Sequence, residues 1–142
     1  MNIDIILEGK LKEPFFKAGA DEFKKRLKGY LELKIIEVSS IDEYLKNNLK
    51  SSDYLITMEI EGNMLSSLEF AGKIKEIEKD GFYNRILFLI GGSDGLSDFA
   101  KQKSTFKFSM SKMTFLHQEA VLILTEQIYR AVKILKNEPY HK

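Results

Sequence analysis

The residues whose types and spacing could do chemistry begin with a glycine-rich stretch after an apolar run. The run 85–90 ends on Gly91 and Gly92, and Gly95 follows three residues later. Glycine tolerates positive φ and has no Cβ, so backbone N–H groups in such a loop can approach a ligand closely. The spacing is neither Gly-x-Gly-x-x-Gly nor a Walker loop. The stretch therefore predicts either a ligand-binding loop or a tight strand-to-helix turn without a ligand.

Other kinds of chemistry are limited by what the chain contains. It has no cysteine, which excludes disulfides, thiolate metal ligands and cysteine nucleophiles. The two histidines, His117 and His141, lie far apart without metal-ligand spacing, so we expect no metal.

The 22 Lys and Arg nearly balance 21 Asp and Glu, so net charge does not reveal a polyanion-binding surface. Asp4 and Glu8 interrupt the first apolar run, and no apolar stretch approaches the roughly 18 residues of a membrane span. We expect a soluble, cytoplasmic protein without a membrane partner.

We call the stretch from Gly91 to Gly95 the glycine loop. The elements that must position it alternate between strands and helices. Apolar runs bounded by turn residues predict strands at 2–7, 33–38, 54–60, 85–90 and 105–109. Helical periodicity predicts helices at 14–28, from Ser39 or Ser40 to residue 50, and at 66–79, 97–102 and 117–137. The segment Glu61-Gly62-Asn63 is expected to break the third strand. This order predicts one α/β domain over 1–142, with a mainly parallel sheet and helices on both faces. In such sheets, ligands bind beyond the carboxyl ends of the strands.

Two of the predicted helices have faces with more than one interpretation. The first helix carries a basic face, which is either simply solvated or a contact surface for RNA phosphates; its residues are Lys17, Lys24, Lys25 and Lys28, with Lys10, Lys12 and Arg26 nearby. In the last helix, apolar residues occupy most of the circumference. They are either buried within one chain or covered by a second subunit, and we expect a homodimer. A site at that interface could take its two halves from different chains.

Several segments together resemble one family, the bacterial ribosomal RNA large subunit methyltransferase H. The similarity covers essentially the whole chain in order, and it is carried by Gly9–Lys12, Thr57–Gly62, Ile90–Leu96, Ser111–Phe115, His117-Gln118, Glu126-Gln127, Tyr129–Ala131 and Pro139–Lys142. This resemblance implies a SPOUT-class enzyme that methylates N3 of a pseudouridine in 23S rRNA, in helix 69. It also implies a homodimer with a C-terminal trefoil knot, and S-adenosylmethionine bound in the knot.

The resemblance also implies site residues. Positions that bind the cofactor in the family correspond to Met58, Gly91, Met110, Ser111, Lys112, Met113, Thr114 and Phe115. Met58 is expected to contribute backbone atoms, and Met113 and Phe115 are alternatively plain core residues. Functional positions in the last helix and tail correspond to Arg130, Tyr140 and His141. The chain departs from the family at Leu116, where relatives usually have proline, and at Val121, where they tend to have arginine.

The implied reaction suggests roles for these tail residues. N3 of a pseudouridine carries a proton that must leave, so a base or a stabiliser of the anion is useful. His141 is the candidate base, Arg130 the stabilising cation, and Tyr140 a stacking platform for a flipped nucleobase. His117 is instead expected to start or pack a helix. A tail this short is alternatively a frayed end.

Three functions remain open from the sequence. The first is a pseudouridine N3-methyltransferase that acts on 23S rRNA, in the large subunit or whole ribosome, through a composite dimer surface. The second is a non-catalytic, dimeric RNA-binding or ribosome-associated module with the same fold. The third is an α/β small-molecule binder of another class.

Overall fold

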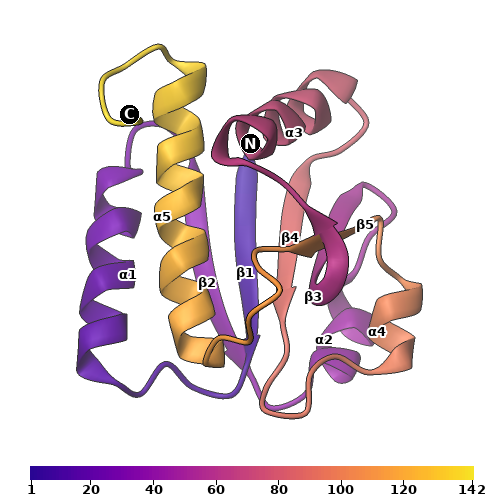
Figure 1. Cartoon of the computed structure of the whole chain (residues 1–142). Helices are drawn as coiled ribbons and strands as arrows, with labels where there is room; N and C mark the ends of the chain where they lie inside the picture. Colours follow the sequence, from indigo (N-terminus) through magenta and orange to yellow (C-terminus); the bar gives the residue numbers. More distant parts are fainter.

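A five-stranded, entirely parallel sheet forms the centre of the protein in the computed structural model, which describes all of residues 1–142 (Figure 1). The strands are β1 (Asn2–Glu8), β2 (Glu32–Val38), β3 (Asp53–Met64), β4 (Arg85–Ile90) and β5 (Phe106–Ser109), in the spatial order β2-β1-β4-β3-β5. The apolar run predicted at 85–90 is the central strand β4, buried by helices on both faces as its composition requires. The predicted α/β class and parallel sheet are confirmed.

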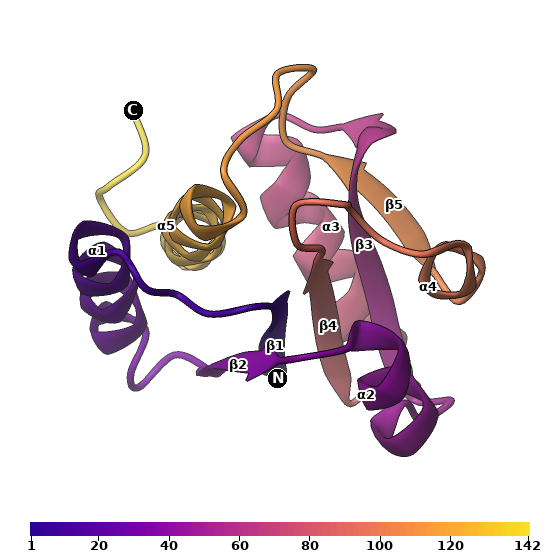
Figure 2. The same ribbon diagram turned by 90° about the horizontal axis from the view of Figure 1, so that it is seen from below.

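Helices cover both faces of this sheet. On one face lie α1 (Pro14–Arg26), α3 (Ser67–Asp80) and α5 (His117–Leu135), which share the larger apolar core with β1 and β4. On the other face lie α2 (Ile41–Asn48) and α4 (Asp98–Gln102), which pack on a smaller core. Figure 2 shows α2 and α4 on the opposite side of the sheet from α1 and α5. No helix is both long and apolar enough to span a membrane.

Serine caps fix where several helices begin. The Ser40 hydroxyl accepts the Glu43 N–H at 3.2 Å, and Ser97 caps α4 in the same way. Ser66 forms a capping box with Glu69, in which each side chain accepts the other residue's backbone N–H. These predicted starts are confirmed to within one residue, whereas α1, α2 and α5 each end two residues earlier than expected.

The predicted end of the third strand is wrong. Glu61-Gly62-Asn63 does not break β3, because the strand runs on to Met64 and pairs with β5 after a register shift between Met58 and Asn63. Gly62 permits this pairing: a Cβ there would lie 2.8 Å from the Lys107 carbonyl group. Residues typical of a turn therefore belong to an irregular strand here. Glycine is needed at position 62 because the β5 backbone comes too close for a larger side chain.

The last helix, α5, lies between α1 and α3 across the sheet (Figure 1). Val121, Leu124 and Ile128 are fully buried there, and Leu122 packs against Gly19 of α1. Burial within one chain thus accounts for much of the apolar circumference of α5. The homodimer stays a prediction that needs other support.

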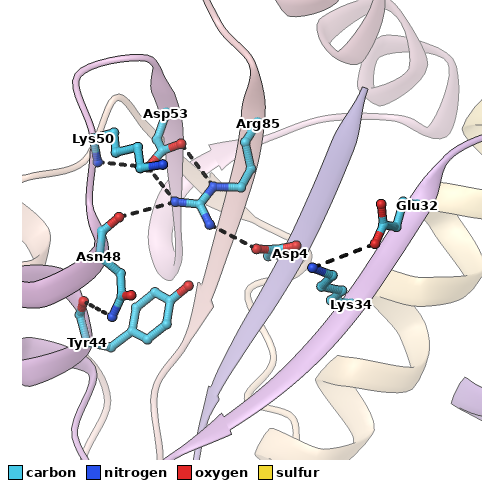
Figure 3. A network of polar contacts seen from close by, with 8 residues as sticks. All are labelled: Asp4, Glu32, Lys34, Tyr44, Asn48, Lys50, Asp53 and Arg85. Atoms are coloured by element: carbon cyan, nitrogen blue, oxygen red, sulfur yellow. Dashed lines mark hydrogen bonds and ion pairs between the residues drawn. The ribbon is translucent and has the colours of Figure 1, made fainter.

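At the amino ends of the strands, a buried polar network joins three strands (Figure 3). Arg85, the first residue of β4, donates from Nε and Nη2 to the two carboxylate oxygens of Asp53, at 2.9 and 2.7 Å. Its Nη1 donates to Asp4 of β1 at 3.2 Å. Asp53 also accepts the Lys50 N–H at 2.8 Å. The network lies at the opposite edge of the sheet from the glycine loop.

Candidate active site

A cavity of approximately 640 Å³ opens beyond the carboxyl ends of β3, β4 and β5. We call it the carboxyl-end cavity. Its walls come mainly from three segments distant in sequence: residues 58–61 within β3, the end of β4 with the loop after it, and the stretch from the end of β5 into the first turn of α5. Almost all the predicted cofactor-binding residues line it, namely Met58, Gly91, Met110, Ser111, Met113, Thr114 and Phe115. Lys112 is exposed and does not contribute to the walls.

The glycine loop owes its shape to contacts within itself. A Cβ on Gly91 would lie 2.5 Å from the carbonyl carbon of Gly95, so only glycine fits there. The Gly95 N–H donates to the Gly92 carbonyl oxygen at 3.0 Å, and Gly95 has a φ of +75°. The loop therefore requires glycine at position 91 whether or not a cofactor is bound. The loop turns its backbone towards the cavity.

The segment between β5 and α5 is held by short-range bonds to serine. The Ser109 hydroxyl donates to the Ser111 carbonyl at 2.9 Å, and the Met113 N–H donates to Ser111 Oγ at 3.0 Å. Met113 is 74% exposed and Leu116 is 66% exposed, so the interpretation of Met113 as a plain core residue is wrong for the single chain. Apolar side chains at the mouth of the cavity are left open to solvent.

The predicted functional residues of the last helix and tail form a second group, which we call the tail cluster: Arg130, Tyr140 and His141, joined by Glu126. Arg130 Nη2 donates to Glu126 Oε2 at 2.7 Å, and the Tyr140 hydroxyl donates to the same oxygen at 2.6 Å. Arg130 Nη1 lies 3.1 Å from His141 Nδ1, and its guanidinium covers the Tyr140 ring. The tail is docked on α5 and not frayed.

Packing against α5 also changes the chemistry of the tail. The Tyr140 ring meets the Tyr129 ring edge-on, with centroids 4.8 Å apart. Burial, and then the hydrogen bond to Glu126, raise the pKa of the Tyr140 phenol above its usual value. Arginine only donates hydrogen bonds, so His141 Nδ1 must be the acceptor in its contact with Arg130, and the neutral ring carries its proton on Nε2.

Glu126 is the member of this cluster that was not predicted as functional. The sequence contained a signal for it, because Glu126 and Arg130 are four residues apart on a helix and therefore share one face. The contact with Tyr140, which makes Glu126 the centre of the cluster, depends on how the chain turns back after α5. That turn includes Asn137 at a φ of +58°.

The carboxyl-end cavity and the tail cluster lie at opposite ends of α5. His117 and Ala120, in its first turn, line the cavity. Since a helix rises about 1.5 Å per residue, the step from His117 to Arg130 spans roughly 20 Å. Figure 1 shows the C-terminal tail at the far end of α5 from its start. The predicted cofactor and catalytic residues are thus not brought together within one chain.

The basic face of α1 is only partly neutralised within the chain. Lys17 pairs with Asp21 at 3.8 Å, and Arg26 pairs with Glu22 at 2.8 Å while covering the Phe23 ring. No ion pair involves the remaining lysines of this face, which are exposed: Lys24, Lys25 and Lys28. The phosphate contact therefore stays a prediction.

Comparison with known proteins gives concordant results. The family model described as "Predicted SPOUT methyltransferase" matches residues 1–141. The ribosomal RNA large subunit methyltransferase H of Alkaliphilus oremlandii is 44% identical over 160 aligned positions, covering 100% of both chains. The protein of the same name from Finegoldia magna is 43% identical, also over 100% of both chains.

A solved structure is similar in fold. The SpoU methyltransferase AviRb from Streptomyces viridochromogenes, solved in complex with the cofactor AdoMet, superposes with a TM-score of 0.54 at 13% identity. The superposition covers 97% of this chain and 58% of that chain. At this level of identity, the likeness concerns the fold alone.

Proposed function

Since the chain belongs to the SPOUT methyltransferase family, we propose that it transfers a methyl group from S-adenosylmethionine to N3 of a pseudouridine in helix 69 of 23S rRNA. The observation that carries the proposal is the convergence of three separate segments on the carboxyl-end cavity. Full-length similarity to proteins named ribosomal RNA large subunit methyltransferase H supports the RNA of the large subunit as substrate. The N3 position and helix 69 rest on the resemblance of the sequence motifs to that family.

The residues of the carboxyl-end cavity fit S-adenosylmethionine. A volume of approximately 640 Å³ lies within the range of small-molecule sites. Ile90, Phe108 and Ala120 offer apolar walls for the adenine, and the glycine loop and residues 110–115 offer backbone donors and acceptors at its edge. When bound, the cofactor supplies an electrophilic methyl group on a cationic sulfur. The residues of the chain must hold the cofactor and place the target base in line with its methyl group.

The tail cluster has groups suited to the target base. Arg130 can stabilise negative charge that develops on the base as the N3 proton leaves, and Tyr140 offers a ring for stacking. In the present arrangement His141 cannot accept that proton, because Nδ1 is bonded to Arg130 and Nε2 carries a hydrogen. We therefore expect Arg130 to turn from His141 to the base, which frees Nδ1 to act as the proton acceptor.

The distance between cavity and tail cluster supports a homodimer. A separation of roughly 20 Å along α5 prevents one chain from completing the site. A second copy, related by two-fold symmetry, can present its tail cluster to this cavity and receive the same in return. Exposed apolar side chains at the cavity supply surface for such an interface; they are Ile60, Met113 and Leu116.

The path of the chain after β5 supports the C-terminal knot. From the edge strand β5, residues 110–116 return to the middle of the sheet, where α5 begins. This return passes the glycine loop, with which it shares the walls of the carboxyl-end cavity. A knot at this place would hold the cofactor loops together without a further domain.

Ribosomes from a strain lacking the protein provide the direct test. The purified protein should add one methyl group to them in the presence of S-adenosylmethionine, and mass spectrometry of 23S rRNA fragments should locate it on a pseudouridine of helix 69. Incubation without the cofactor is the control. Ribosome binding without any methylation would reject the enzymatic proposal and favour the non-catalytic module.

A further inference from the structure

The carboxyl-end cavity is lined by more negative than positive side chains. Glu59, Glu61 and Asp94 contribute carboxylates, and Lys101 is the one lysine among the lining residues. None of these four side chains forms an ion pair within the chain. This excess stands out in a protein with a formal net charge of +1. Because RNA phosphates are repelled by it, the negative charge calls for another explanation.

Glu59 is the best fixed of the three carboxylates. The Thr57 hydroxyl, which is fully buried, donates to Glu59 Oε2 at 2.6 Å. Thr57 Oγ1 also lies 2.7 Å from Ser104 Oγ, and since a hydroxyl has a single hydrogen, Ser104 is the donor of that second bond. Glu61 and Asp94 are exposed, whereas Glu59 is half-buried. Its charge is therefore less screened by solvent than theirs.

Glu59 lies at the edge of the sheet where the pairing between β3 and β4 ends. Thr57 forms the last pair between β3 and β4, opposite Leu89, so Glu59 lies just beyond the shared edge. The relay from Ser104 through Thr57 ties the carboxylate to the segment before β5. The structure thus holds one carboxylate at a defined point of the cavity wall.

The two forms of the proposed cofactor differ in charge. S-adenosylmethionine carries a sulfonium, an ammonium and a carboxylate, and so a net charge of +1. Loss of the methyl group converts the sulfonium to a neutral thioether, and the product S-adenosylhomocysteine has no net charge. A fixed negative group in the cavity attracts the first more than the second.

We propose that Glu59 is a specificity-determining residue that makes the cavity prefer cationic S-adenosylmethionine over its neutral product. This inference rests on the proposed function. It gives the cavity a means of releasing the product after each transfer, because the electrostatic attraction disappears with the sulfonium charge. Two other roles for Glu59 make different predictions. A contact with the ammonium group would favour both molecules equally, and a purely structural bond to Thr57 would favour neither.

Isothermal titration calorimetry of the full-length protein with each molecule separates these roles. The variant Glu59→Gln keeps an oxygen that can accept the Thr57 hydrogen bond but removes the charge. We expect it to bind S-adenosylmethionine about tenfold more weakly and S-adenosylhomocysteine within about twofold of wild type. Glu61→Gln, at an exposed position, should show a smaller effect, and Glu76→Gln on the outer face of α3 should show none.

Ionic strength provides a second measurement that needs no variant. Added salt should weaken binding of S-adenosylmethionine to the wild-type protein more than binding of S-adenosylhomocysteine. An equal loss of affinity for both molecules in Glu59→Gln, or no loss for either, would overturn the role of Glu59. Failure of the wild-type protein to bind either molecule would instead reject the proposed function itself.

Discussion

Replacing Arg85 by methionine tests what the buried network at the amino ends of the strands contributes to stability. The change removes the cation that faces Asp53 and Asp4, whose side chains are 2% and 6% exposed. Two carboxylates would then remain buried without a counter-charge. Breaking a buried ion pair by removing one partner costs about 3–5 kcal/mol. Because the Arg85 side chain is 22% exposed, water can reach the site, and we expect the lower end, about 3 kcal/mol.

Urea denaturation followed by circular dichroism measures this loss. A loss of that size should also lower the melting temperature by roughly 10 °C in a domain of this length. Lys34→Met is the matched control: its pair with Glu32 is 3.6 Å long and more than half exposed on both sides, so we expect no measurable change. A loss below about 1 kcal/mol for Arg85→Met would refute the reasoning, since it would mean that the carboxylates are not held by Arg85.

The same variant has a predictable response to pH. Burial alone would raise the pKa of Asp53, but the hydrogen bonds from Arg85 and the Lys50 N–H outweigh it and hold this pKa below its usual value. A lowered folded pKa gives stability that is present above the unfolded pKa, near 3.9, and is lost as the pH falls through the folded value. The difference between wild type and Arg85→Met should therefore be full at pH 7 and narrow as the pH falls from about 5 towards 3. A constant difference would contradict this account.

Further predictions concern the two halves of the proposed site. Glu126→Gln should lower the pKa of Tyr140 towards its usual value in an ultraviolet titration, in which Tyr140→Phe identifies the signal of Tyr140. The same variant should reduce methylation. An unchanged titration would show that Glu126 does not contact the phenol. Gly91→Val should abolish cofactor binding by distorting the loop at Gly95, and normal affinity in calorimetry would reject that steric account. Removal of residues 138–142 should spare cofactor binding but abolish methylation, and an active truncated protein would exclude a role for the tail. Mixing the Gly91→Val and truncated chains should restore activity, because the truncated chain supplies an intact cavity and the Gly91→Val chain supplies an intact tail to the same heterodimer. No recovery in a mixed dimer of verified composition would argue against a shared site.

Local patterns predicted the fold well where a single element decides the outcome. The apolar run of β4 matched its observed bounds, because a strand buried on both faces needs an uninterrupted run. The continuation of β3 through Gly62 was missed, because it depends on close approach of the β5 backbone, which no local pattern contains. Turn-like composition was misleading there for the same reason.

Seven of the eight positions predicted to bind the cofactor line one cavity, whereas the arrangement of the site could not be predicted. The motif residues around Gly91 and 110–115 do converge on one cavity, as expected for the carboxyl ends of parallel strands. The central place of Glu126 depends on the return of the tail to α5, which only the three-dimensional path reveals. The separation of the tail cluster from the cavity likewise follows from the uninterrupted course of α5.

The strand order has a consequence for how the protein is made. β1, the first strand of the chain, lies between β2 and β4, and the helix that completes its covering is α5, the last. A growing chain therefore cannot close its main core until residues beyond 117 have been synthesised. Such dependence on contacts between distant parts of the sequence slows folding and leaves apolar strands exposed in the meantime. We expect nascent chains that lack α5 to depend on chaperones, and the main core to close only after α5 has been synthesised.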